Sequence, residues 1–170
     1  SALRAGADSR PGDRGIGGST GSPITEDPFN RAPHTFNSYN LMANWRISPR
    51  FNFSAWGGYG DSQGQGFDRA GFDRIGDSGD SWTWNAALSI VDLGTKGSVL
   101  TFSGGQVPRT PFAEGSIPDL NASYIVETQY KYPVTKNILF TPGFFVVFNP
   151  NHNNENPTLW VGLLRTTFKF

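Results

Sequence analysis

Charged and amide side chains recur at every second position in parts of the sequence, which is the spacing of one face of a β-strand. The residues in this pattern are Arg46, Glu127, Gln129, Lys131, Arg165 and Lys169. Such rows along a wall of strands can set the electrostatic field that a passing solute meets. A purely structural role stays open, because the same groups can neutralise one another as cross-strand pairs.

Side chains suited to nucleophilic or acid–base catalysis are few. The chain has two histidines and no cysteine, so disulfides and thiolate metal sites are excluded. His152 lies in the polar stretch NPNHNNEN without a partner nearby in sequence, and His34 is similar. No serine stands in a nucleophile-elbow pattern. We therefore expect no enzymatic activity, no catalytic residue and no cofactor.

A second polar stretch, GFDRAGFDRIGDSGDS (66–81), brings several aspartates together. Asp77 and Asp80 could join nearby carbonyls around a calcium ion, but the spacing does not match an EF-hand loop. A solvated loop is the favoured interpretation, and we expect no metal site.

The elements that carry these residues are predicted to be strands. We expect seven, at 35–47, 51–60, 80–92, 98–107, 121–132, 137–148 and 158–170, each about 10–14 residues long against a usual 5–6. A strand that crosses a membrane at a tilt needs about 9–11 residues. The connections alternate between short turns at 48–50, 93–97 and 133–136 and long loops at 61–79, 108–120 and 149–157. Membrane β-barrels sort their connections in this way.

The apolar faces of these strands point to the same class. Their aromatic residues fall into two bands on either side of Leu, Ala, Val, Ile and Gly, the girdle pattern of a lipid-facing surface. Near the short turns lie Trp45, Tyr130, Tyr132, Phe168 and Phe170; near the long loops lie Trp82, Trp84, Tyr124 and Trp160. A soluble β-sandwich would alternate its faces as well but has no reason to form such bands.

Two features fit the pattern less well. Trp56 falls on the polar face, as do Phe145 and Val147. Pro142 lies inside a predicted strand, where its missing N–H suggests a bulge at Pro142–Gly143. Residues 1–34 are rich in Gly, Pro and charged residues and read as a long outer loop or mobile segment.

An odd number of strands cannot close a bacterial barrel, and open sheet edges are not tolerated in lipid. We therefore interpret residues 35–170 as the C-terminal portion of a larger barrel whose earlier strands lie upstream. The terminal aromatic strand is expected to engage the barrel-assembly machinery. Basic and acidic residues balance at 14 each, so no nucleic-acid partner is expected.

Several segments resemble the OprB-type porins, specifically the major outer-membrane porins of cyanobacteria. They are NWRISPRFNFSAWGGY (44–59), VDLGTKGS (91–98), GQVPR (105–109), ETQYKYPVTKNILFTPGFFVVFNPNHNNEN (127–156) and LWVGLLRTTFKF (159–170). The resemblance implies a barrel of about sixteen strands around an aqueous channel. It also implies an inward-folded constriction loop, whose residues the sequence does not identify.

The function we expect is passive diffusion of small hydrophilic solutes, inorganic ions including iron and sugars, across the cell outer membrane. Family members are described as carbohydrate-selective or as iron-uptake porins, and the sequence does not choose between these labels. It also leaves monomer and homo-oligomer open. The alternatives are a barrel enzyme, a plugged transporter or, less favoured, a soluble β-sandwich binding domain.

Overall fold

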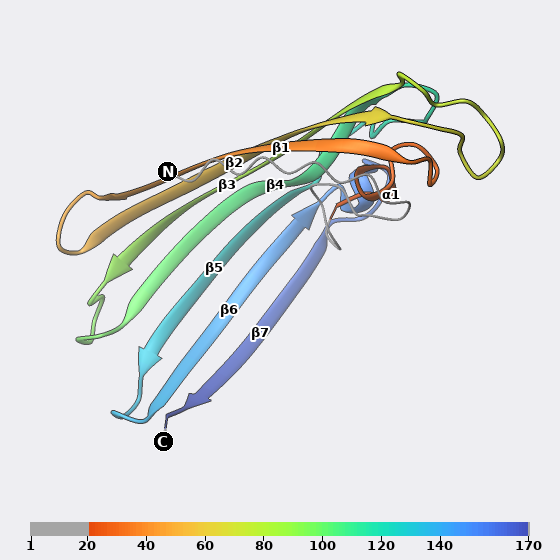
Figure 1. The fold of residues 1–170 in the computed structure, drawn as a ribbon. Coiled ribbons are helices and arrows are strands. Elements are labelled where there is room, and N and C mark those ends of the chain that lie inside the picture. The colour runs from red at the N-terminus through yellow and green to blue at the C-terminus, as the bar shows by residue number, and fades with distance from the viewer. Residues whose placement is uncertain (1–20, 170) are drawn as a thin grey trace.

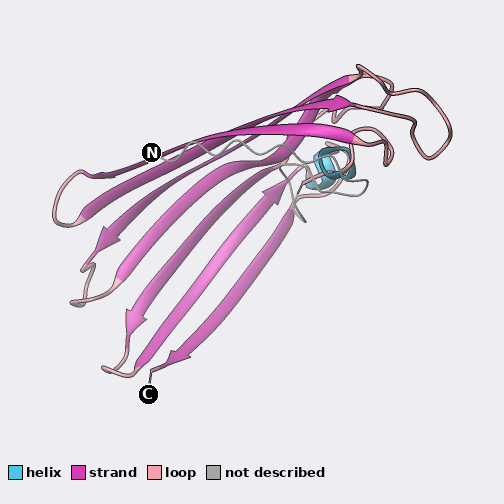
Figure 2. Ribbon diagram, viewed as in Figure 1, coloured by secondary structure: helices cyan, strands magenta, loops and turns pink. Residues whose placement is uncertain are grey.

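The computed structural model describes residues 21–169, which form a single antiparallel sheet with very little helix (Figure 2). Seven strands follow one another in chain order. They are β1 (His34–Arg46), β2 (Phe51–Gly64), β3 (Ser78–Val91), β4 (Val99–Ala113), β5 (Tyr124–Pro133), β6 (Ile138–Phe148) and β7 (Leu159–Phe168). A short helix, α1 (Pro23–Glu26), precedes them, and a 3₁₀ turn, η1 (Pro150–His152), precedes β7. The all-β prediction is confirmed, and among the described residues β1 and β7 remain as open edges.

The short turns gather at one end of the sheet and the long connections at the other (Figure 1). Two strands run further toward the long-loop end than predicted: β2 continues to Gly64 and β4 to Ala113. β4 contains Pro108 and Pro111, which have no N–H to donate. They lie where the β3–β4 register shifts, opposite the segment between Asp80 and Trp84, and irregular pairing tolerates a missing N–H.

The predicted bulge at Pro142–Gly143 is wrong. Gln129 pairs with Gly143 and Tyr132 pairs with Phe140, so the β5–β6 register is the same on both sides of Pro142 and no residue is inserted. The pairing of β5 with β6 is interrupted between these two pairs, because Pro142 has no N–H to donate. On its other side Pro142 keeps its place opposite Leu164 of β7.

The strand register divides the sheet into two faces, because residues paired across strands point the same way. We call one the aromatic face; its central row consists of Ala43, Ala55, Ala86, Gly104, Val126, Val146 and Trp160. We call the other the polar face; its neighbouring row consists of Asn44, Ser54, Ala87, Ser103, Glu127, Phe145 and Val161.

Candidate channel wall

The residues expected to line a pore all lie on the polar face. Arg46 and Gln129 lie in the same row of paired residues across the sheet. This row runs from Arg46 through Asn52, Ser89 and Thr101 to Gln129. Arg165 lies opposite Thr141, and Lys131 lies opposite Val99. Arg46, Lys131, Arg165 and Lys169 all stand in the half of the sheet next to the short turns, whereas Glu127 lies further along β5. The basic groups therefore concentrate near one end of this wall.

The wall charges do not neutralise one another in the part of the chain that the structure describes. The ion pairs found between residues 21 and 169 both belong to Arg74, which contacts Asp68 at 3.0 Å and Asp77 at 3.3 Å. The alternative of cross-strand pairing along the wall is thus not observed within these residues.

A segment preceding β1 folds onto the polar face at the long-loop end. We call residues 21–33 the inward segment. Ser22 caps α1 and donates its hydroxyl to Asp119 Oδ2 at 2.6 Å. Thr25 contacts Thr110 at 3.0 Å, and Thr110 contacts Ser81 on β3 at 2.8 Å. This chain of buried hydroxyls fixes α1 against the polar face (Figure 1).

The rest of the inward segment is equally well fixed. Phe29 is fully buried and meets the ring of His34 edge-on, with 5.8 Å between ring centroids. The carbonyl of Pro28 accepts a 2.7 Å hydrogen bond from the Ser116 hydroxyl. His34 is buried, and its Nδ1 lies 3.0 Å from the Ala32 carbonyl. His34, the first residue of β1, thus holds the inward segment in place through its contacts with Phe29 and Ala32.

His152 is not the partnerless loop residue that the sequence suggested. It is 4% exposed, and its Nδ1 accepts the Ser123 N–H at 3.1 Å. The ring proton therefore lies on Nε2, which donates to the Pro108 carbonyl at 3.0 Å. Both partners are distant in sequence, by 29 and 44 residues, so the local sequence did not indicate them. His152 ties η1 to β4 and has a structural role.

Comparisons with known proteins agree with this architecture. The family described as "Carbohydrate-selective porin, OprB family" matches residues 3–170. This chain belongs to the OprB family. An uncharacterized Synechocystis protein is 32% identical over 165 residues, covering 89% of this chain, and an uncharacterized Nostoc protein is 36% identical over 136 residues, covering 79%. The chain spans only 30% and 22% of these two relatives. No solved structure matches it.

The family match confirms the resemblance to cyanobacterial OprB-type porins. Between residues 21 and 169, no helix is long and apolar enough to cross a membrane.

The connection between β2 and β3 in this OprB-family chain is largely exposed, as expected for a solvated loop, but internal hydrogen bonds to one buried residue hold its conformation. The buried carboxylate of Asp68 accepts hydrogen bonds from Ala70 N–H at 2.8 Å, Phe72 N–H at 2.9 Å and Arg74 at 3.0 Å. Burial by itself would raise the pKa of Asp68, but the Phe72 N–H and the Arg74 guanidinium hold that pKa below its usual value.

The aspartates considered for calcium do not converge. Asp77 contacts Arg74, whereas Asp80 accepts the Tyr59 hydroxyl at 2.7 Å. No cluster of three metal-ligand side chains occurs among the residues that the structure covers. These carboxylates thus have protein partners in place of a metal.

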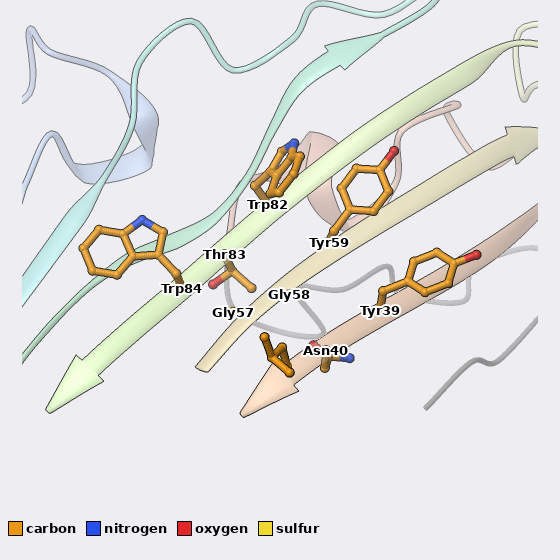
Figure 3. Close-up of a pocket in the computed structure, with 9 residues that line it drawn as sticks. Tyr39, Asn40, Gly57, Gly58, Tyr59, Trp82, Thr83 and Trp84 are labelled. Atoms are coloured by element: carbon orange, nitrogen blue, oxygen red, sulfur yellow. The ribbon is translucent and has the colours of Figure 1, made fainter. Parts of the chain in front are cut away.

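The aromatic face carries the residues predicted for the girdles. Near the long loops Tyr39, Tyr59 and Trp82 are paired side by side on three neighbouring strands. The ring centroids of Tyr59 and Trp82 are 4.7 Å apart. These rings line a groove of about 470 Å³, which Gly57 also borders. The rings are drawn in Figure 3. The other aromatic contacts along this face join Trp84 with Tyr124, Tyr130 with Tyr132, and Phe144 with Trp160. Trp45 and Phe168 are well exposed, and Phe170 lies outside the described residues.

Proposed function

We propose that this chain forms part of the wall of a water-filled outer-membrane channel, with the polar face toward the pore and the aromatic face toward lipid. The observation that carries the proposal is the register, which separates amides, hydroxyls and charges from bands of aromatic residues on strands of 10–15 residues. A lipid-exposed barrel surface needs that separation. Membership of the OprB family supports it.

The proposed channel passes small hydrophilic solutes by passive diffusion, namely inorganic ions including iron and sugars. The inward segment lies on the polar face and reduces the free cross-section near the long loops. The polar face carries basic residues near the short turns, and the long loops carry more Asp and Glu than Arg, so the two ends of the proposed channel differ in charge. Fields of this kind bias which solutes enter.

The same proposal assigns the partners. Outer-membrane lipid covers the aromatic face, and the final strand is the part that the barrel-assembly machinery engages. The edges of β1 and β7 need further strands, because unpaired backbone groups are not tolerated in lipid. Whether the complete barrel is a monomer or a homo-oligomer is a question for cross-linking in native membranes.

Two adjacent alanines provide a matched test of the faces. Ala86 lies in the central row of the aromatic face, and Ala87 lies on the polar face. In the full-length gene product, Ala86→Arg should reduce outer-membrane insertion, because a mid-membrane arginine facing lipid costs about 2–4 kcal/mol. Ala87→Arg should insert normally.

Insertion is measured by the amount of heat-modifiable, protease-resistant barrel in isolated outer membranes. Normal insertion of Ala86→Arg together with failed insertion of Ala87→Arg would mean that the faces are reversed. Equal insertion of both variants would remove the support for a lipid-facing surface.

A further inference from the structure

Two cations and a hydroxyl lie side by side on the polar face near the short turns. Thr141 of β6 pairs directly with Arg165 of β7. On its other side, the β5–β6 register is the same before and after Pro142 and places Lys131 opposite Thr141. Lys131, Thr141 and Arg165 therefore occupy one row across three neighbouring strands, with their side chains on the same face. We call these three residues the basic row.

The middle of the basic row is a buried hydroxyl. Thr141 is only 9% exposed. The side-chain hydrogen bonds between residues 21 and 169 include those of the adjacent turn, at Thr135 and Asn137, but none to the Thr141 hydroxyl. Buried hydroxyls are normally hydrogen-bonded, because leaving one unpaired costs stability. Thr141 therefore has a donor available for a group that these residues do not supply.

The two cations beside Thr141 are not neutralised within the described part of the chain. Lys131 and Arg165 are exposed, and the ion pairs found between residues 21 and 169 both belong to Arg74. The carboxylate of β5 on this face, Glu127, lies about 13 Å from Lys131 along the strand. The basic row therefore presents two positive charges and one hydroxyl donor toward the open side of the wall.

The types and spacing of these groups select a ligand class. The backbones of β5 and β7 are two strand spacings apart, about 10 Å, so the long side chains of Lys131 and Arg165 can converge on one small ion above Thr141. Two cations balance an ion that carries two negative charges. The planar guanidinium of Arg165 and the Thr141 hydroxyl donate to separate acceptor atoms, which an anion with several oxygens offers and a halide does not.

We propose that the basic row is a binding subsite for tetrahedral oxyanions of charge two, such as hydrogen phosphate and sulfate. Arg165 donates to two of the oxygens, Thr141 donates its hydroxyl to a third, and the Lys131 ammonium contacts the ion from the β5 side. The inference rests on the proposed function, because solutes reach the row only if the polar face lines the channel. It deepens that function by naming one class of ion that binds saturably at a defined place on the wall.

The first test records the current through the full-length protein in a planar bilayer, in potassium chloride at mildly alkaline pH, as inorganic phosphate is added. Phosphate should reduce the current saturably. Arg165→Gln and Lys131→Gln should each weaken this block about tenfold, because each removes a charged donor. Thr141→Val keeps the shape but removes the hydroxyl, and should weaken the block about threefold. Arg165→Lys should fall between wild type and Arg165→Gln, since an ammonium keeps the charge but lacks the planar fork.

Lys136→Gln is the matched control. It removes one positive charge at the same end of the sheet, but Lys136 lies in the turn between β5 and β6 and not on the wall. It should leave the phosphate block within about twofold of wild type, because salt screens an exposed charge at that distance. Arg46→Gln removes a cation of the same face on β1, at the opposite edge of the sheet from β7. If it weakens the block as much as Arg165→Gln does, the wall acts through its overall field and the subsite is overturned.

Phosphorus NMR on the detergent-solubilised protein measures phosphate binding independently of conduction. Line broadening that Thr141→Val and Arg165→Gln both reduce supports the subsite even if no current flows, in which case only the proposed channel function fails. A conductance that phosphate never blocks, with no line broadening, overturns the subsite but leaves the channel intact. A block by bromide as strong as the block by phosphate would also overturn it, because the row would then recognise charge alone.

Discussion

The two ends of the sheet are built in different ways. At the short-turn end the bonds within each turn are local: Phe51 N–H donates to Ser48, Gly97 N–H donates to Asp92 at 2.6 Å, and Ile138 N–H donates to Thr135. At the long-loop end the bonds join distant segments. Ser22 and Asp119 are 97 residues apart, and Ser116 and Pro28 are 88 apart. The long-loop end therefore depends on tertiary contacts, whereas each short turn is specified by its own residues.

This difference has a functional consequence. A porin must hold its inner surface in one shape while solutes pass, and the rim is where the inward segment is fixed. Changes at the long-loop end should loosen that segment and the rim. Equivalent changes at the short-turn end should remain confined to a single turn.

The largest expected effect comes from a glycine at the long-loop end of β2. In Gly64→Ala the new Cβ would overlap the backbone carbonyl of Arg74, and backbone cannot move aside cheaply. We expect a loss of about 3 kcal/mol in unfolding free energy. Gly162→Ala in β7 is the control, since nothing lies within 4 Å of its added Cβ, and it should change stability by less than about 0.5 kcal/mol. Urea titration of folded barrel measures both, and equal losses would contradict the importance of the close approach at Gly64.

Removal of one carboxylate should release the inward segment. Asp119 accepts both the Ser22 hydroxyl at 2.6 Å and the Thr110 N–H at 2.8 Å. Because hydrogen bonds to charged groups contribute about 1.5–3 kcal/mol, Asp119→Ala should speed hydrogen exchange in residues 22–33 by ten- to a hundredfold. Asp92→Ala, at the opposite end, should affect exchange only in the 92–98 turn. Unchanged exchange in the inward segment of Asp119→Ala would show that other contacts suffice.

Acid should loosen the β2–β3 connection. Because the pKa of Asp68 is held below its usual value, its ionised form stabilises the fold at pH above about 4, and this contribution disappears as pH falls through the lowered pKa. Limited proteolysis at 65–77, by a protease active in acid, should thus accelerate below about pH 4. Asp68→Asn should remove the pH dependence between pH 2 and 5. A wild-type cleavage rate that stays constant across that range would refute the role of the carboxylate.

The smallest effect is expected at the short-turn end. The Tyr130 hydroxyl donates to the Leu93 carbonyl at 2.6 Å in an exposed position. Tyr130→Phe should reduce stability by about 0.5 kcal/mol, since water replaces the lost donor. A loss as large as that of Asp119→Ala would mean that the short turns are coupled to the whole sheet.

The contrast between the ends also explains what the sequence could predict. Strand alternation and turn residues are local signals, so the seven strands, the short turns and the division of residues into two faces could be predicted. The extensions to Gly64 and Ala113 were not predicted, because the residues there, DSQG (61–64) and PRTPFA (108–113), lack the apolar alternation on which the prediction rested. The partners of His152 and the position of the inward segment follow from contacts between distant segments that no local pattern records.

The central claim is that the polar face lines a water-filled channel. Single-channel recording of the full-length protein, purified from outer membranes and placed in a planar bilayer, tests it most directly. The account predicts a stable ohmic conductance that increases with salt concentration. A correctly folded barrel that conducts no ions under any applied voltage would contradict it.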